Sequence, residues 1–85
     1  MKYRIEFTRS AIEDLAAAWL AAADRTALSQ ASHGLETDLA ENPFGKGESR
    51  GSPLERIISD RPLGMWYDII PDDMKIIVQS VWLIH

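Results

Sequence analysis

The chain has 85 residues, which suffices for one domain over residues 1–85 but not for two. It contains no cysteine, and its longest apolar runs are far shorter than the roughly 20 residues that cross a bilayer. Nine Lys and Arg against thirteen Asp and Glu give a net charge of −4, which argues against broad nucleic-acid affinity, and we expect no direct sequence-specific DNA binding by the chain alone. The N-terminus lacks the apolar core of a signal peptide. These features predict a small cytoplasmic domain without disulfides or membrane association.

The first predicted element is a strand over residues 2–8. Tyr3, Ile5 and Phe7 alternate with charged residues. A period of two indicates a strand with one buried face.

A helix is predicted to follow this strand. Ser10 and Glu13 have the spacing of a capping box, so we expect the helix to begin at Ser10. Apolar residues recur at helical spacing and predict its buried face. This face comprises Ile12, Leu15, Trp19, Leu20 and Ala23. Trp19 is accordingly interpreted as a core residue.

A second helix is predicted over residues 26–41, with Asp24 as its N-cap. Its apolar stripe consists of Leu28, Ala31, Leu35 and Leu39. Gly34 lowers helix stability by about 1 kcal/mol relative to alanine, but would let a neighbouring helix approach. Asn42-Pro43 ends the helix, because the residue before a proline disfavours helical backbone angles. The short connection between the two helices predicts a helical hairpin.

The C-terminal half is predicted to form three strands after a polar loop at residues 43–53. They span about 54–60, 65–70 and 74–84, and Pro71-Asp72-Asp73 makes the last turn. The order β-α-α-β-β-β predicts an α+β fold: an antiparallel four-stranded sheet with the helical hairpin on one face and the other face partly open. The expected core is Ile5, Phe7, Leu15, Trp19, Leu35, Leu39, Tyr67 and Ile69.

The sequence shows no pattern of a cofactor or metal site. It has no glycine-rich phosphate loop, no zinc-ligand spacing and no nucleophile–His–Asp set. Asp72 and Asp73 suit a turn better than a metal site, because too few other ligands lie in register. His33, in the middle of a helix, is interpreted as an exposed residue. We therefore predict no cofactor and no metal.

Short motifs along the whole chain resemble the RelE/ParE superfamily of toxins from type II toxin–antitoxin systems. They are Tyr3-Arg4-Ile5-Glu6-Phe7, Ser10-Ala11-x-x-Asp14-Leu15, Leu39-Ala40-Glu41-Asn42-Pro43 with Gly45, Trp66-Tyr67-x-Ile69, and Ile76-Ile77-Val78. The resemblance implies a growth inhibitor, of the kind used in plasmid stabilisation, whose active surface is covered by a cognate antitoxin. Some members of the superfamily cut mRNA on the ribosome, whereas the ParE branch inhibits DNA gyrase.

The residues favour the ParE branch. Family nucleases often carry an arginine just after the tyrosine of the third strand, where this chain has Asp68. They often end the last strand with a His or Tyr that follows a basic residue, and here Trp82 or Leu83 occupies that place. Because phosphate must be held and its developing charge stabilised by cations, these differences argue against nuclease activity.

The alternatives remain a ribosome-dependent endoribonuclease and a decayed toxin that binds only its antitoxin. In a nuclease, Arg56, Arg61 and His85 would be catalytic, while Lys46 and Arg50 would contact phosphate or the target. These cations can also be read as solvated charges paired with Glu48, Glu55 and Asp60, and His85 as the frayed end of the chain. The expected partners are an antitoxin and either gyrase or the ribosome.

Two tryptophans are candidates for antitoxin binding. Strand alternation puts Trp66 on the side of Asp68, and it puts Trp82 on the side of Ile76 and Val78. One of them would lie on the open sheet face and contact an antitoxin peptide, with a core position as the alternative for each. Protein binding, rather than catalysis, is the predicted activity.

Overall fold

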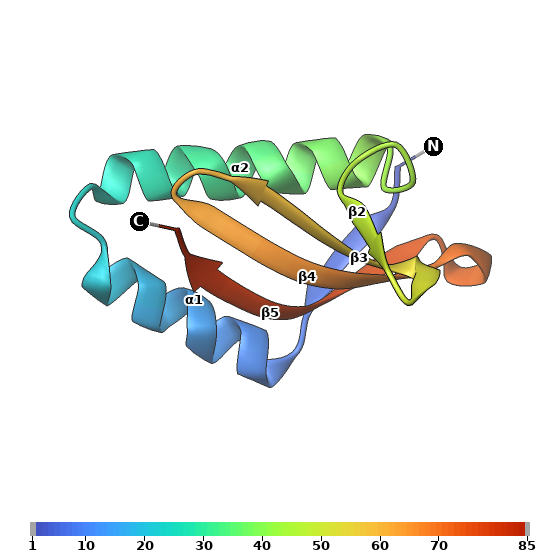
Figure 1. Cartoon of the computed structure of the whole chain (residues 1–85), viewed down its shortest axis with the longest axis horizontal. Helices are drawn as coiled ribbons and strands as arrows, with labels where there is room; N and C mark the ends of the chain where they lie inside the picture. The colour runs from blue at the N-terminus through green and yellow to red at the C-terminus, as the bar shows by residue number, and fades with distance from the viewer. Residues whose placement is uncertain (1, 85) are drawn as a thin grey trace.

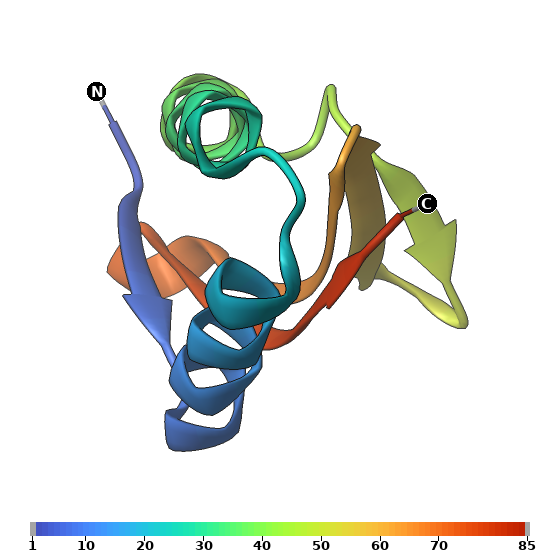
Figure 2. The ribbon, with the colours of Figure 1, turned by 90° about the vertical axis from the view of Figure 1, so that its left-hand side faces the viewer.

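The computed structural model describes residues 2–84. Its elements in chain order are β1 (Arg4–Phe7), α1 (Arg9–Ala21), α2 (Arg25–Glu41), β2 (Glu48–Arg50), β3 (Ser52–Asp60), β4 (Leu63–Ile70), the 3-10 turn η1 (Pro71–Asp73) and β5 (Lys75–Leu83). The sheet curves around both helices, which lie on its inner side, while β2 lies at its outer edge (Figures 1 and 2). No helix within residues 2–84 is long and apolar enough to cross a membrane.

The α+β class and the helical hairpin on one face are confirmed, but the sheet differs from the prediction in two respects. It has five strands in the order β1-β5-β4-β3-β2, because residues 48–50 of the predicted loop pair with β3. It is also mixed, since β1 runs parallel to β5 while the other pairs are antiparallel. Alternation predicts which face of a strand is buried but not its neighbours, so the sequence could not reveal either feature.

Helix α1 begins at a different cap from the one predicted. Thr8, not Ser10, is the N-cap: its backbone is extended and its hydroxyl accepts a bond from the N–H of Ala11 at 3.1 Å. The same hydroxyl donates to the carbonyl of Gln79 on β5 at 3.4 Å, which ties the start of the helix to the sheet. The predicted cap of α2 is confirmed, because Asp24 accepts from the N–H of Ala27 at 3.0 Å.

The predicted buried face of α1 is wrong for most of its members, since among the predicted large residues only Leu15 packs against the core, and it is half-buried. The helix buries Ala11 and Ala18, while Ile12 is 57% exposed, Trp19 40% and Leu20 75%. The rotation of the helix is set by Asp14, whose carboxylate accepts bonds from the β5 backbone and a β5 serine. Small alanines let the helix approach the sheet closely, so the larger apolar residues turn outward.

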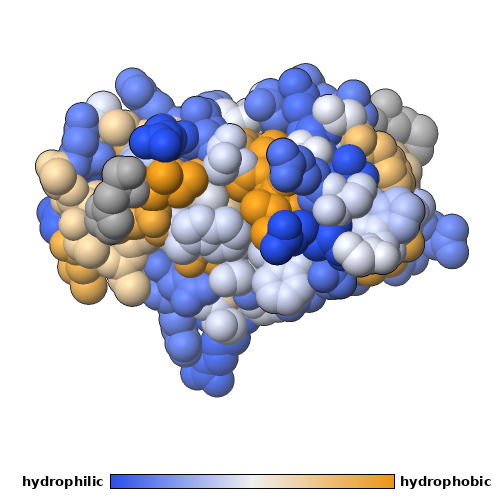
Figure 3. All heavy atoms as spheres, in the orientation of Figure 1, coloured by the Kyte–Doolittle hydropathy of each residue, from blue (hydrophilic) through white to orange (hydrophobic). Residues whose placement is uncertain are grey.

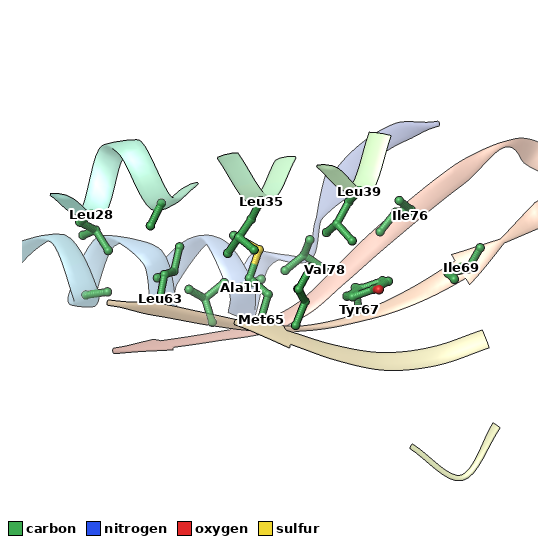
Figure 4. Close-up of a cluster of buried hydrophobic side chains, with 14 residues drawn as sticks. Ala11, Leu28, Leu35, Leu39, Leu63, Met65, Tyr67, Ile69, Ile76 and Val78 are labelled. Atoms are coloured by element: carbon green, nitrogen blue, oxygen red, sulfur yellow. The ribbon is translucent and has the colours of Figure 1, made fainter. Parts of the chain in front are cut away.

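The core lies between α2 and the inner face of the sheet (Figure 4). The predicted α2 stripe is confirmed, and Tyr67 and Ile69 are buried with it, whereas Ile5 and Phe7 are half-buried at its edge. The buried hydrophobic residues are Ala11, Ala18, Leu28, Ala31, Leu35, Leu39, Ile58, Leu63, Met65, Tyr67, Ile69, Ile76, Val78 and Val81. Gly34 does not serve helix approach: a Cβ there would lie 3.6 Å from the carboxylate of Asp60, at the end of β3.

A β-bulge in β5 changes which side chains face outward. Trp66 pairs with Ser80 and Tyr67 with Val78, which leaves Gln79 as an extra residue. An extra residue reverses the alternation beyond it. Trp82 therefore shares the face of Trp66, and the prediction that it shares the face of Ile76 and Val78 is wrong.

Candidate functional site

The sheet face opposite the helices carries an apolar surface. Its members come from β3, β4 and β5, and we name the set Ile57, Trp66, Ile77 and Trp82 the open-face patch. Trp66 is 39% exposed, and the other three are half-buried. The ring of Trp82 covers Gly64, where a Cβ would come within 2.5 Å of it. Figure 3 looks onto this side and shows apolar atoms in its middle, bordered by hydrophilic ones.

Two carboxylates border the open-face patch. Glu55 of β3 is paired with Asp68 of β4, so both side chains lie on the same face as Trp66. The amide of Gln79, the extra residue of the bulge, donates to Asp68 at 2.8 Å and holds that carboxylate in place. This part of the open face is therefore negatively charged and opposes the approach of a phosphate.

Arg56 follows Glu55 on β3 and pairs with Tyr67 of β4. Its guanidinium binds the protein's own backbone. It donates to the carbonyls of Lys46 at 3.1 Å, Pro53 at 3.0 Å and Gly47 at 3.5 Å. These bonds hold the loop before β2 against β3. The catalytic role of Arg56 stays a prediction. To contact a substrate, the guanidinium of Arg56 would have to break its bonds to these backbone carbonyls.

The remaining predicted basic residues are spread along the sheet. Lys46 and Arg50 are exposed near Arg56, on the loop and on β2. Arg61 follows β3 five residues beyond Arg56, a separation of about 17 Å at the rise of an extended strand. His85 lies outside the described residues. The fold therefore brings Lys46 and Arg50 close to Arg56 at the middle of β3, and it places Arg61 beyond the C-terminal end of that strand.

Tyr67 is a core residue whose hydroxyl contacts the loop before β2, the same loop that Arg56 binds. Its buried hydroxyl lies 3.1 Å from the carbonyl oxygen of Pro43 and 3.0 Å from that of Lys46, and its single proton is shared between these two acceptors. Gly47, with a φ of +72°, lets the loop pass so close, because a Cβ there would meet the Tyr67 hydroxyl. Burial raises the pKa of Tyr67 above its usual 10.0, and the nearby charge of Arg56 partly offsets that rise.

Replacing Tyr67 by phenylalanine is expected to lower the free energy of unfolding by about 1–2 kcal/mol, because two loop carbonyls lose their donor. Urea denaturation measures the change.

The raised pKa of Tyr67 also makes the wild type lose stability in alkali. The stabilisation that comes from the protonated Tyr67 is complete below pH 10 and is lost as the pH rises through the pKa of the folded state. Tyr67→Phe should lack that part of the alkaline loss. An equal slope of stability against pH in both proteins would contradict this assignment.

Solved structures resemble nearly the whole chain, whereas family models and curated proteins do not match it. The RelBE2 toxin–antitoxin complex from Mycobacterium tuberculosis matches with a TM-score of 0.75 and 17% identity over 98% of this chain and 99% of that one.

A mutant of the E. coli toxin RelE in the free state matches with a TM-score of 0.74 and 21% identity, over 98% of this chain and 84% of that chain. The chromosomal ParDE system from P. aeruginosa matches with a TM-score of 0.68 and 17% identity, over 98% and 97%. The chain therefore has the fold of the RelE/ParE toxins, as its motifs predicted.

Proposed function

We propose that this chain, which has the RelE/ParE fold, is the toxin of a type II toxin–antitoxin module and is neutralised by a cognate antitoxin. The observation that carries the proposal is a match to both toxin types over 98% of the chain, in structures solved as toxin–antitoxin complexes. A fold alone leaves the activity open, so the target must be argued from residues.

The open face favours DNA gyrase over mRNA as the target. Glu55 and Asp68 make it negative where a nuclease would hold a phosphate, and the donors of Arg56 bind the loop. An apolar surface beside two carboxylates suits a protein better than a polyanion. The chain then acts by binding, without cofactor or metal.

A ribosome-dependent endoribonuclease is the second candidate. RelE and RelBE structures are among the matches, with TM-scores from 0.67 to 0.75, a range that includes the 0.68 of the ParDE system. Lys46, Arg50 and Arg56 would hold the RNA, with Arg61 and His85 as the other catalytic candidates. A decayed toxin that only binds its antitoxin is the remaining alternative.

The antitoxin is proposed to cover the open-face patch. Trp66 has the largest exposed side chain there, and Trp82 lies beside it on the same face. Small domains seldom leave such apolar surface uncovered, and a partly exposed tryptophan is typical of the centre of an interface. Covering this face would also block access of the target to it.

Binding to the protein encoded by the neighbouring small gene tests the proposal. The wild type should form a complex that copurifies, and Trp66→Ala should weaken it by about 30-fold, which corresponds to roughly 2 kcal/mol of a hot-spot contact. Phe44→Ala is the matched control, because Phe44 is an equally exposed aromatic residue on the loop before β2. Separate elution of the two wild-type proteins at micromolar concentration would contradict the toxin–antitoxin assignment.

A further inference from the structure

Two carboxylates oppose each other across β3 and β4 at the border of the open-face patch. Glu55 of β3 is the direct partner of Asp68 of β4, and both residues are half-buried. The Cβ atoms of directly opposite residues lie about 4.5–5.5 Å apart, and like charges in such a pair destabilise a sheet. A cation placed between the two carboxylates would remove this cost.

The part of the chain that the structure describes supplies no cation to this pair. Neither carboxylate takes part in an ion pair within residues 2–84. Arg4 and Lys75, which β1 and β5 place opposite each other, both bind Glu6, at 3.9 and 4.0 Å. Asp68 receives a neutral donor, the amide of Gln79, which fixes the carboxylate in place and leaves its charge uncompensated.

An exposed aromatic ring lies beside the two carboxylates. Trp66 precedes Asp68 by two residues on the same face of β4, so the two residues lie about 7 Å apart along the strand. Trp66 pairs with Ile57, and Glu55 pairs with Asp68, so these four residues form the corners of one rectangle on the open face. A cationic group that lies between the carboxylates can therefore also contact the indole ring, and a cation over the face of a tryptophan is further stabilised.

Arginine is the side chain that fits this arrangement. Its planar guanidinium has enough donors for both carboxylates and stacks on aromatic rings, whereas a lysine ammonium is a point charge. Its aliphatic stem would pack on Trp66. The rest of the open-face patch is apolar, and Glu48, exposed on β2 opposite Ile57, adds a further negative charge at its rim. The complement of an apolar centre with a negative rim is an apolar segment that carries positive charge.

We propose that the protein segment that covers the open-face patch is apolar and basic, with one arginine that binds between Glu55 and Asp68 and packs its stem on Trp66. The identity of that protein as an antitoxin rests on the proposed function, whereas the arginine site belongs to this chain. The net charge of −4 favours the same partner, because it attracts a basic segment from a distance.

A short peptide tests the arginine site without any antitoxin. The probe is an acetylated and amidated pentapeptide with a central arginine between two valines, and NMR follows the indole N–H signal of Trp66. It should bind about fivefold more tightly than the same peptide with citrulline, which has nearly the same shape without the charge. Glu55→Gln should remove this difference, whereas Glu36→Gln, at a half-buried glutamate of α2, should keep it. Equal binding of both peptides to the wild type, or no binding of either, would overturn the proposal.

The complex with the protein encoded by the neighbouring small gene tests the same site on the natural partner. Glu55→Gln and Asp68→Asn should each weaken binding by about tenfold and reduce its dependence on salt, whereas Glu36→Gln should change neither. Glu55→Gln should also unfold at a higher urea concentration than the wild type, because the repulsion across the strands is gone. Wild-type affinity in both neutral variants would refute the arginine site. A wild type that forms no complex contradicts the proposed function instead, and the peptide titration still decides this inference.

Discussion

Cells that express this chain without its antitoxin are expected to stop dividing while their mRNA keeps its normal ends. The reason is the charge on the open face, where Asp68 stands next to Glu55 and is held in place by Gln79. Two unit charges 4 Å apart interact by about 4 kcal/mol at an effective dielectric of 20. A carboxylate facing a scissile phosphate would therefore oppose binding by a few kcal/mol, where an arginine would assist it by a similar amount.

Neither Arg56 nor Arg61 is placed to offset this effect in the folded chain. The donors of Arg56 bind the backbone carbonyls of Lys46, Gly47 and Pro53, and Arg61 follows the C-terminal end of β3. Cations that stabilise a developing negative charge must be preorganised around one position. Growth arrest with inhibited DNA supercoiling is therefore the expected outcome.

Primer extension on mRNA from induced cells measures the outcome, and Arg56→Ala and His85→Ala are the informative variants. With wild-type protein, no new ends should arise at ribosome positions, and both variants should give the same pattern. Discrete cleavage that disappears in either variant would establish the nuclease in place of the gyrase inhibitor. A complete lack of toxicity would indicate the decayed toxin.

Leu39→Ala is expected to destabilise the domain by about 2–5 kcal/mol, a large part of the total for a domain this small. Leu39 is fully buried between α2 and the sheet, beside Val78 and Ile76 (Figure 4). The loss combines the transfer of the deleted atoms with the cavity that they leave. Urea denaturation at fixed pH should show a lower midpoint or a chain already unfolded in water.

Leu20→Ala removes the same atoms and serves as the control. Because Leu20 is 75% exposed on α1, its truncation should change the free energy of unfolding by less than about 0.5 kcal/mol. The sequence pattern assigned both leucines to buried faces, so the pair separates that prediction from the structure. Equal destabilisation by the two variants would mean that α1 buries the other face.

Part of the candidate site was predictable from the sequence. Period-two alternation correctly placed Trp66 on the side of Asp68, and the position of Asp68 beside Tyr67 already argued against a phosphate site. The pairing of Asp68 with Gln79 was not predictable, because it depends on the bulge. The bonds of Arg56 to the loop join residues nine and ten positions apart, and those of Tyr67 join residues 21 and 24 positions apart, beyond the reach of local periodicity.

By itself, the sequence determined the order of the elements other than β2, the α2 stripe, the Asp24 cap and the end of α2 at Asn42-Pro43, because each depends on neighbours within about four residues. Only the tertiary structure decided the rotation of α1, the side of Trp82 and the parallel pairing of β1. A carboxylate at Asp14 that binds β5 and one extra residue at Gln79 act across the chain. Local periodicity does not predict contacts between residues far apart in the sequence. Which apolar residues stay exposed is therefore decided only when the helices pack on the sheet.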